Sequence, residues 1–442
     1  MRRRFKTVSE IAAWRLCTGC GACAAACPEK NLTLVDVPTL GLRPFRVSTG
    51  CRHCGRCVAV CPGVEMTKEK TDAGAIPKLR KGWGEILEIW EGYACDPEIR
   101  YQGSSGGVAT AISLFCLEKE RMTAVLQIRA HPEIPWRNVP VLSVDRTDVV
   151  MCTGSRYSPA SPCEKIDMIK NASSPCVFIG KPCDVAALRK FQNLDQEIVS
   201  KVGLAISIFC AGTPSTAGTK AVFSALGVSE DQVEQISYRG CGWPGTTKVK
   251  LHSPNDKELE MGYEQSWGAI LSKYVQFRCR ICPDSTGEFA DICCGDAWHR
   301  NIDGSQPGYS LVLVRTEKGR KTLTAAIKAG YVHLRKADPD ALPLSQMPLL
   351  NKKRNIWGRV LAMRMLAVPC PRFKGFSLFA NWRELSLRDK SQSLLGTAYR
   401  IISRRWNKPL DVSPAQFDET RRFAPASCAL KSCDSEPDNR PT

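Results

Sequence analysis

Residues 17–28 read CTGCGACAAACP, and residues 51–62 read CRHCGRCVAVCP. Both stretches carry four cysteines in the pattern C-x2-C-x2-C-x3-C, with a proline directly after the fourth. Glycines at positions 19, 21 and 55 allow the backbone to wrap closely around a compact group, because glycine adopts conformations closed to other residues. This repeated pattern decides the fold of the first 75 residues or so.

The spacing is that of the bacterial ferredoxin run, in which the fourth cysteine ligates the other cluster of a pair. It predicts two 4Fe–4S clusters with crossed ligand sets. A zinc site is the alternative, but zinc favours paired CxxC motifs, and His53 is the only histidine in the two runs. The first cluster is expected on Cys17, Cys20, Cys23 and Cys61, and the second on Cys51, Cys54, Cys57 and Cys27.

Cysteine usage also indicates the compartment. The chain has 442 residues and 23 cysteines, and a long chain this rich in cysteine more often uses it for metals than for disulfides. The N-terminal residues lack the apolar stretch of a secretory signal, and no run of about 18 apolar residues predicts a membrane span. We therefore expect a cytoplasmic protein with reduced thiols.

Beyond the cysteine runs, short apolar segments alternate with helical patterns, which favours an α/β or α+β domain. The whole pattern predicts a small ferredoxin-like two-cluster domain (1–75), a larger mixed α/β domain (85–345), a basic helical extension (346–410) and a disordered tail (411–442). Expected strands cover 124–128, 176–179, 202–209 and 311–314. Expected helices cover 108–119, 185–191, 215–226, 319–329, 356–367 and 394–406.

The net charge of +18 is concentrated in one part of the chain. Between Lys352 and Lys408, 14 Lys and Arg face only Glu384 and Asp389, a local net charge of +12. A nucleic-acid-binding surface would spread its charge more widely, and we expect no nucleic acid partner. The patch suits an acidic protein or an anionic membrane surface, and a solvated basic face is the simpler alternative.

Four further segments carry candidate chemistry. The loop at 104–107, SSGG, precedes an apolar helix, where exposed backbone N–H groups favour a phosphate, although a tight turn explains it as well. Cys183 and Cys210 stand where expected strands end, and open α/β sheets place their sites there. Cys279 and Cys282 form a CxxC pair, which packing alone explains poorly, whereas a single buried cysteine is usually structural.

Over about residues 85–345 the chain resembles the beta-subunit family of coenzyme F420 hydrogenases and dehydrogenases. The motifs that carry the resemblance are SSGG (104–107), GSRY (154–157), GKPCDVAAL (180–188), FCAGT (209–213), YRGCGWPG (238–245), CRICPD (279–284) and ADICCGDAW (290–298). The family includes deazaflavin-reducing subunits and ferredoxin-dependent reductases of chlorophyll-type pigments. Its members resemble one another in binding FAD beside a 4Fe–4S cluster.

The resemblance implies a third cluster on Cys183, Cys210, Cys279 and Cys282. It implies FAD contacts at Ser104, Ser105, Gly106, Gly107, Gly154, Ser155, Arg156, Tyr157, Lys181, Arg239, Gly240 and Trp243. Two departures stand out. Lys181 replaces the small residue usual before this proline, and Cys293 or Cys294 is an alternative ligand of the third cluster. Arg156, Lys181 and Arg239 are the candidate cations for flavin or substrate phosphates.

A ferredoxin-like module joined to a flavin domain implies conversion between one-electron and two-electron transfer. We therefore expect an oxidoreductase that exchanges electrons with a ferredoxin or another redox protein, and hydride with a small organic substrate of the coenzyme F420 type or another kind. The alternative is an electron-relay subunit of a larger complex with no organic substrate of its own. No catalytic residue is assigned from the sequence.

Overall fold

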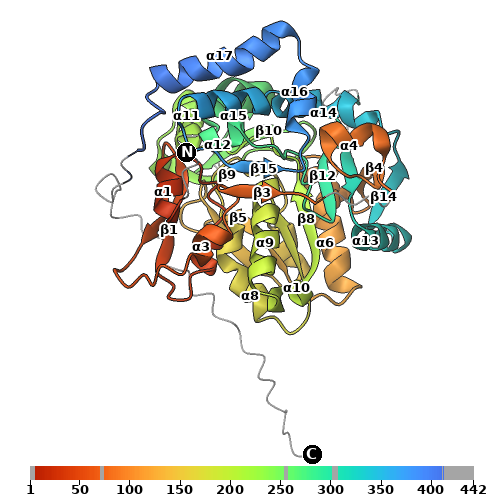
Figure 1. Ribbon diagram of the computed structural model, residues 1–442. Coiled ribbons are helices and arrows are strands. Elements are labelled where there is room, and N and C mark those ends of the chain that lie inside the picture. Colours follow the sequence, from red (N-terminus) through yellow and green to blue (C-terminus); the bar gives the residue numbers. More distant parts are fainter. Residues whose placement is uncertain (1–4, 70–73, 253–256, 301–306, 411, 413–442) are drawn as a thin grey trace, which may run out of the picture.

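The computed structural model describes residues 5–69, 74–252, 257–300, 307–410 and 412 (Figure 1). The predicted disordered tail at 411–442 lies almost wholly outside the described residues. Among the described helices, none has the length and apolar character needed to cross a membrane. The fold is a mixed α/β arrangement, with a small N-terminal cysteine-rich module, a larger sheet domain and C-terminal helices.

The N-terminal module holds two short helices that each begin at a glycine in the left-handed region. Gly21 (φ 88°) caps one helix and Gly55 (φ 76°) caps the other. A Cβ on Gly21 would lie 2.7 Å from the backbone nitrogen of Glu164, so no larger residue fits there. The elements of the module are α1 (Val8–Ala13), α2 (Ala22–Ala25), β1 (Leu32–Val37), β2 (Gly41–Arg46), α3 (Arg56–Ala59) and β3 (Glu65–Thr67).

An eight-stranded mixed sheet forms the centre of the larger domain, in the order β14-β4-β13-β12-β8-β7-β5-β6. Strands β5, β7, β8 and β12 run parallel, and antiparallel strands complete both edges. The strands are β4 (Glu88–Ala94), β5 (Val125–Ala130), β6 (Asn138–Ser143), β7 (Cys176–Gly180), β8 (Val202–Ile208), β12 (Ile292–Asp296), β13 (Ser310–Val314) and β14 (Val332–Lys336). All four strands expected from the sequence are present, with ends shifted by a residue or two.

Helices cover both faces of this sheet, which explains why its inner strands are continuously apolar. One face packs on α4 (Pro77–Trp83), α8 (Ile166–Lys170), α9 (Pro182–Leu194), α10 (Glu197–Lys201) and α14 (Ala341–Arg354). The other packs on α5 (Pro97–Gln102), α6 (Val108–Glu118), α7 (Arg146–Val150) and α13 (Glu317–Lys328). The predicted helix at 185–191 begins earlier, because Pro182 occupies its first turn, where a missing N–H costs nothing.

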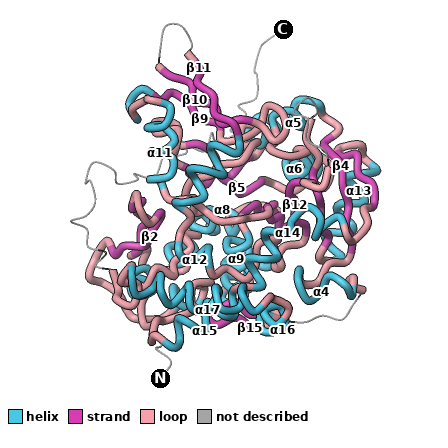
Figure 2. The backbone as a smooth tube through the Cα atoms, turned by 90° about the horizontal axis from the view of Figure 1, so that it is seen from above, coloured by secondary structure: helices cyan, strands magenta, loops and turns pink. Residues whose placement is uncertain are grey.

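A second, smaller sheet lies to one side of the molecule (Figure 2). It has the order β11-β10-β9 and sits beside α11. Its elements are α11 (Thr216–Leu226), η2 (Glu230–Gln232), β9 (Val233–Ser237), β10 (Thr246–Leu251), β11 (Glu258–Gly262), η3 (Glu264–Ile270) and η4 (Leu271–Tyr274); η1 (Pro162–Lys165) belongs to the central domain. The hairpin brings the loop at 238–245 back toward the central sheet.

The basic extension packs onto the N-terminal module. Strand β15 (Arg372–Lys374) pairs in parallel with β3, so two segments far apart in the sequence share one sheet. Met363 and Ile401 join Ile11 and Leu16 in a common apolar core. The remaining elements are α12 (Phe277–Arg280), α15 (Ile356–Met365), α16 (Leu378–Arg383) and α17 (Leu387–Ser403), and α17 lies outermost in Figure 1.

Candidate functional site

The structure gathers the first crossed set of cysteines around one small cavity. Cys17, Cys20, Cys23 and Cys61 all line it, together with apolar side chains that include Val8, Ile11 and Leu34. Burial raises the pKa of Cys23, and the neighbouring thiolates raise it further. Four thiols that repel one another as thiolates fit a positively charged iron core. The cavity, closed off by apolar groups, is therefore suited to hold a cluster.

The second crossed set lies nearer to solvent. Burial raises the pKa of Cys57, and Cys54, Cys27 and Cys51 raise it further, so these four thiols lie within electrostatic reach of one another. The side chain of Cys54 is exposed, and the other three are half-buried. This set is the outer of the two.

The third set assembles where three segments of the larger domain meet. Cys183 lies in the first turn of α9, Cys210 follows β8, and Cys279 and Cys282 lie on and after α12. Burial and then Cys279 raise the pKa of Cys210 to about 12. The ammonium of Lys352 donates to the carbonyl oxygens of Cys210 and Ala211, at 3.4 and 2.9 Å. A cation thus stands beside this third group of thiols.

The two alternative ligands of the third set lie apart from it, in strand β12. The thiol of Cys293 donates to the carbonyl of Gly287 at 3.1 Å and accepts from the guanidinium of Arg315 at 3.3 Å. Cys294 points to the opposite face of the sheet and lines a cavity at the carboxyl ends of β7, β8 and β12. In the described part of the chain, no three His, Cys, Asp or Glu side chains converge as around one metal ion. The thiolates of a cubane bind different irons and stand further apart.

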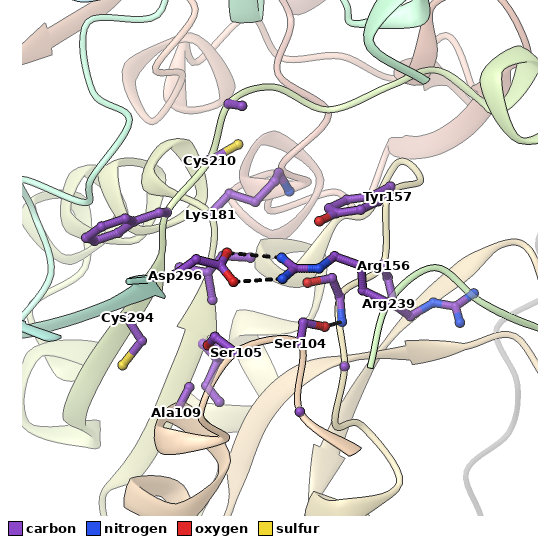
Figure 3. A pocket seen from close by; sticks show the side chains of 18 of the residues that line it. Ser104, Ser105, Ala109, Arg156, Tyr157, Lys181, Cys210, Arg239, Cys294 and Asp296 are labelled. Atoms are coloured by element: carbon purple, nitrogen blue, oxygen red, sulfur yellow. Dashed lines mark hydrogen bonds and ion pairs between the residues drawn. The ribbon is translucent and has the colours of Figure 1, made fainter. Parts of the chain in front are cut away.

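A cavity of about 280 Å³ opens at the carboxyl ends of β7, β8 and β12 (Figure 3). This is the edge at which open α/β sheets place their ligands. The first turn of α6 contributes Val108, Ala109 and Thr110 to the wall, and no side chain caps that helix terminus. Its backbone N–H groups are therefore available to an anion, which fits the diphosphate of a dinucleotide.

Most of the predicted FAD contacts line this cavity. They are Ser104, Ser105, Gly107, Gly154, Ser155, Arg156, Tyr157, Lys181 and Arg239. The remaining three are not among the lining residues. The N–H of Gly106 donates to Ser310, a Cβ on Gly240 would lie 2.4 Å from the carbonyl of Gln102, and the Trp243 ring stacks on Trp298.

Arg239 forms a bidentate ion pair with Asp296 across the cavity, at 3.0 and 2.7 Å (Figure 3). The arginine side chain is 3% exposed. Burial opposes the charge of Arg239, but Asp296 more than compensates and raises its pKa. Asp296 also accepts from the indole N–H of Trp243 at 2.9 Å. The cation is thus neutralised within the protein and held rigidly.

Lys181 is likewise paired. Its ammonium lies 2.7 Å from the carboxylate of Asp184 and donates to the carbonyl of Ala160 at 3.3 Å. Despite burial, Asp184 and then the thiolates of Cys183 and Cys210 raise the pKa of Lys181. Lys181, Asp184 and Cys210 all line the cavity, so this ion pair and the third cysteine set meet at its wall.

The hydrogen bonds of Arg156 hold segments of the cavity wall together. Its guanidinium donates to the side chain of Asn138 and to backbone carbonyls, among them that of Ile236 at 3.3 Å. The neighbouring N–H of Ser155 donates to the hydroxyl of Ser104 at 2.6 Å, which ties the GSRY and SSGG segments together. Arg156 thus holds these segments together at the cavity wall, and its contact with a phosphate stays a prediction.

Two carboxylates and three aromatic rings of the site were not predicted from the sequence. Asp184 and Asp296 neutralise the two cavity cations, and Tyr263, Trp267 and Trp298 line the same space. The signal for Asp296 was present, because the GDAW segment spans the end of strand β12 at this edge. Trp298 belongs to the same GDAW segment, whereas Tyr263 and Trp267 follow β11 of the smaller sheet and have no such signal.

Comparison with known proteins agrees with this architecture. The family profile described as "Coenzyme F420 hydrogenase/dehydrogenase, beta subunit" matches in two parts, its N-terminal section at residues 89–166 and its C-terminal section at 174–340. A 4Fe-4S dicluster domain matches residues 16–66, which confirms the prediction of a two-cluster ferredoxin-type module.

Individual relatives are distant but extensive. A coenzyme F420 hydrogenase subunit beta from Methanococcus voltae is 28% identical over 291 residues, which cover 63% of this chain and 95% of that protein. A coenzyme F420-dependent sulfite reductase from Methanocaldococcus jannaschii is 24% identical over 368 residues, covering 79% of this chain and 51% of that one.

A solved structure shows the same fold. It is a chain of the F420-reducing [NiFe] hydrogenase complex from Methanosarcina barkeri, with a TM-score of 0.52 and 20% identity, covering 66% of this chain and 97% of that chain. Taken with the order of the motifs and the cysteine-rich module that precedes them, these matches show that the chain belongs to the coenzyme F420 hydrogenase/dehydrogenase beta-subunit family and carries an N-terminal 4Fe–4S dicluster domain.

Proposed function

We propose that the protein is an iron–sulfur flavoprotein oxidoreductase, which passes single electrons between a ferredoxin-like partner and FAD and exchanges hydride with a small organic substrate. The observation that carries this proposal is the position of α9. Its first turn holds Cys183 of the third set, and the ion pair of Lys181 and Asp184 at the same point lines the cavity. A one-electron centre and a ligand cavity thereby share one turn of helix.

Burial supports an order for the three cysteine sets. The second set, with the exposed Cys54, is suited to receive electrons from a soluble partner. The first set is enclosed by apolar residues, and the third set adjoins the cavity. Electrons would therefore travel from the second cluster to the first and on to the third, or in reverse, since the arrangement is equally open to both directions.

Within the cavity the residues of this chain would bind and orient the flavin and keep water away from it. A bound flavin supplies the ability to take electrons singly and transfer them as hydride. The uncapped N–H groups of α6 would bind its diphosphate. Arg239, fixed by Asp296, and the aromatic side chains of Tyr157 and Trp267 would hold a planar ring and keep solvent from it. Lys181, held by Asp184, would place an ammonium donor beside both the flavin and the third cluster.

The substrate belongs to the proposal as well. Relatives whose names state a substrate act with coenzyme F420, and a deazaflavin is planar and anionic, which suits an aromatic cavity with buried cations. We accordingly propose a coenzyme F420-type or related planar acceptor.

The second candidate function is an electron-relay subunit without a substrate of its own. It is favoured by the outer face of α17, where Leu387, Leu395, Tyr399 and Ile402 are exposed while Ser393 and Thr397 pack inward. An apolar stripe on a basic extension suits a protein partner or an anionic membrane surface.

The test is to purify the chain without oxygen and to measure iron and flavin in the same sample. About twelve irons with one FAD support three 4Fe–4S clusters and a flavin. About eight irons without flavin would refute the flavoprotein proposal and leave the ferredoxin-type module. Turnover of a deazaflavin by the isolated chain with a reduced ferredoxin then separates the enzyme from the relay subunit, which would reduce its flavin but no added acceptor.

A further inference from the structure

Two arginines are buried at the junction of the first and third cysteine sets. Arg43 is 2% exposed and Arg278 is 1% exposed. The Nε of Arg43, and both Nε and Nη1 of Arg278, are buried without a hydrogen-bond partner among the described residues. A guanidinium removed from water without a countercharge is strongly unfavourable. The structure therefore holds two buried cations whose countercharge has to be identified.

Arg43 connects β2 of the N-terminal module to the helix of the CxxC pair. Its Nη1 donates to the carbonyl of Leu42 at 2.7 Å, and the thiol of Cys17 lies 3.9 Å from that same oxygen. Both terminal nitrogens donate to the Oε1 of Gln276, at 3.3 and 3.2 Å. The N–H of Cys279 in turn donates to the backbone carbonyl of Gln276 at 3.0 Å. Arg43 thus reaches from a first-set thiol to the segment that holds a third-set thiol.

Arg278 makes the same connection in the opposite direction. It precedes Cys279 on α12, and its Nη2 donates to the carbonyl of Pro62 at 3.1 Å and contacts the sulfur of Met66 at 3.2 Å. Pro62 directly follows Cys61 of the first set. On its other side the guanidinium lies 5.3 Å from the ring of Phe373 in the basic extension.

No carboxylate neutralises these two arginines. In the described ranges neither forms an ion pair, and the carboxylate whose charge acts on Arg43 is that of Asp36. That carboxylate is already engaged, because it accepts from the hydroxyl of Thr216 at 2.6 Å and lies 3.8 Å from the guanidinium of Arg137. The groups near the two arginines are cluster ligands. The Cys17 thiol shares the Leu42 carbonyl with Arg43, and Arg278 directly precedes Cys279 and donates to the residue after Cys61.

We propose that Arg43 and Arg278 form a cationic bridge between the first and third clusters, which supplies the countercharge of both and favours their reduced states. The inference rests on the proposed function, since it requires both clusters. A cubane held by four thiolates is anionic and becomes more so when it accepts an electron, and net charge nearby is one determinant of its reduction potential. A cation placed between the two clusters therefore stabilises the reduced state of each, before and after the electron moves from one to the other.

The experiment compares Arg278→Gln with Arg278→Lys and Arg43→Gln in the full chain, purified without oxygen. Glutamine keeps a donor for the Pro62 carbonyl but removes the charge, and lysine keeps the charge. Arg280→Gln is the matched control, because Arg280 lies two residues away on the same helix and is exposed to solvent. Iron content is measured first, and the reduction of each cluster is then followed by a potentiometric titration monitored by electron paramagnetic resonance.

With iron retained, Arg278→Gln is expected to lower the equilibrium constant for reducing the first and third clusters at least tenfold, about 59 mV for a one-electron couple. Arg43→Gln is expected to act in the same direction. The second cluster and Arg278→Lys should remain near wild type, and Arg280→Gln should shift the third cluster much less, because water screens its exposed charge. Unshifted potentials in both glutamine variants, or a shift as large in Arg280→Gln, would overturn the bridge.

Loss of iron also has a defined meaning. If Arg278→Gln loses clusters while Arg278→Lys keeps about twelve irons, the charge itself is required for assembly, and the bridge is supported. If both variants lose iron equally, the role of Arg278 is steric and the proposal fails. A wild-type chain with about eight irons would instead refute the third cluster, and with it the proposed function, before any variant is compared.

Discussion

Replacing Asp296 with asparagine should release the cavity wall that Arg239 fixes. The carboxylate makes a bidentate pair with a guanidinium that is 3% exposed, and it is itself 18% exposed. Removing one partner of a buried pair costs about 3–5 kcal/mol. Because Asp296 retains some contact with solvent and asparagine keeps one acceptor oxygen, we expect about 2–3 kcal/mol.

Amide hydrogen exchange in the loop at 238–247 measures this loss locally, on the protein with its cofactors bound. A loss of 2–3 kcal/mol corresponds to about 30- to 150-fold lower protection. The double-mutant cycle with Arg239→Gln isolates the pair. The double variant should be less destabilised than the sum of the two single variants, by about 1–3 kcal/mol, because no charge is left uncompensated.

An exposed pair supplies the control. Lys248 and Glu258 lie 2.9 Å apart with side chains 28% and 44% exposed, so Glu258→Gln should cost no more than about 1 kcal/mol. Additivity within about 0.5 kcal/mol in the Asp296 and Arg239 cycle would refute the reasoning, since it would mean that the two charges do not stabilise each other.

Three further predictions follow from single positions. Gly107→Ala should abolish flavin retention, because Gly107 has φ 71° and a Cβ there would lie 2.6 Å from the carbonyl of Ile99; Gly330→Ala, at φ 76° in open space, should retain flavin and cost only about 1–2 kcal/mol. Cys279→Ser should retain about eight irons by colorimetric assay, whereas Cys116→Ser, in the core of α6, should retain about twelve. Glu91→Gln should flatten the acid side of the pH–stability curve: although burial raises the pKa of Glu91, its arginine partners lower it on balance from 4.5, so its stabilisation is present above about pH 4.5 and is lost as the pH falls through the folded-state value. Equal denaturant midpoints for Glu91→Gln and wild type across that window would contradict this.

The sequence was most informative for the N-terminal clusters, because the spacing of the cysteines alone predicts their ligands. The crossed sets around Cys23 and Cys57 could be expected from two repeated runs, because the pattern specifies which loop supplies each thiol. Strands β5, β7, β8 and β13 were also recognisable, since strands buried on both faces are continuously apolar. The central strand β12 was not predicted, because its ICCGD sequence has no clear apolar run. Strand β4 was not predicted, because it carries the buried Glu91, whose charge is balanced by Arg300 and Arg335 from distant segments.

The cavity cations show where such reasoning stops. Arg156, Lys181 and Arg239, predicted as cofactor contacts, all line the cavity, but a sequence does not reveal which charges are already paired. Their partners are Asp184, three positions along α9, and Asp296, 57 positions away in another strand. The role of Arg156 depends on carbonyl groups from separate loops, which only the fold brings together.

The pairing of β15 with β3 has a consequence for the order of biosynthesis. The first cysteine set is complete once Cys61 has been made, but the core that shields it also needs Met363 and Ile401, and the neighbouring strand arrives only with Arg372. During translation the nascent module therefore waits for some 300 further residues before it can close, a loop length that makes this contact slow to form. The apolar cover of the first cysteine set therefore forms late in synthesis, and a chain truncated before residue 372 would lack both β15 and the contact from Ile401.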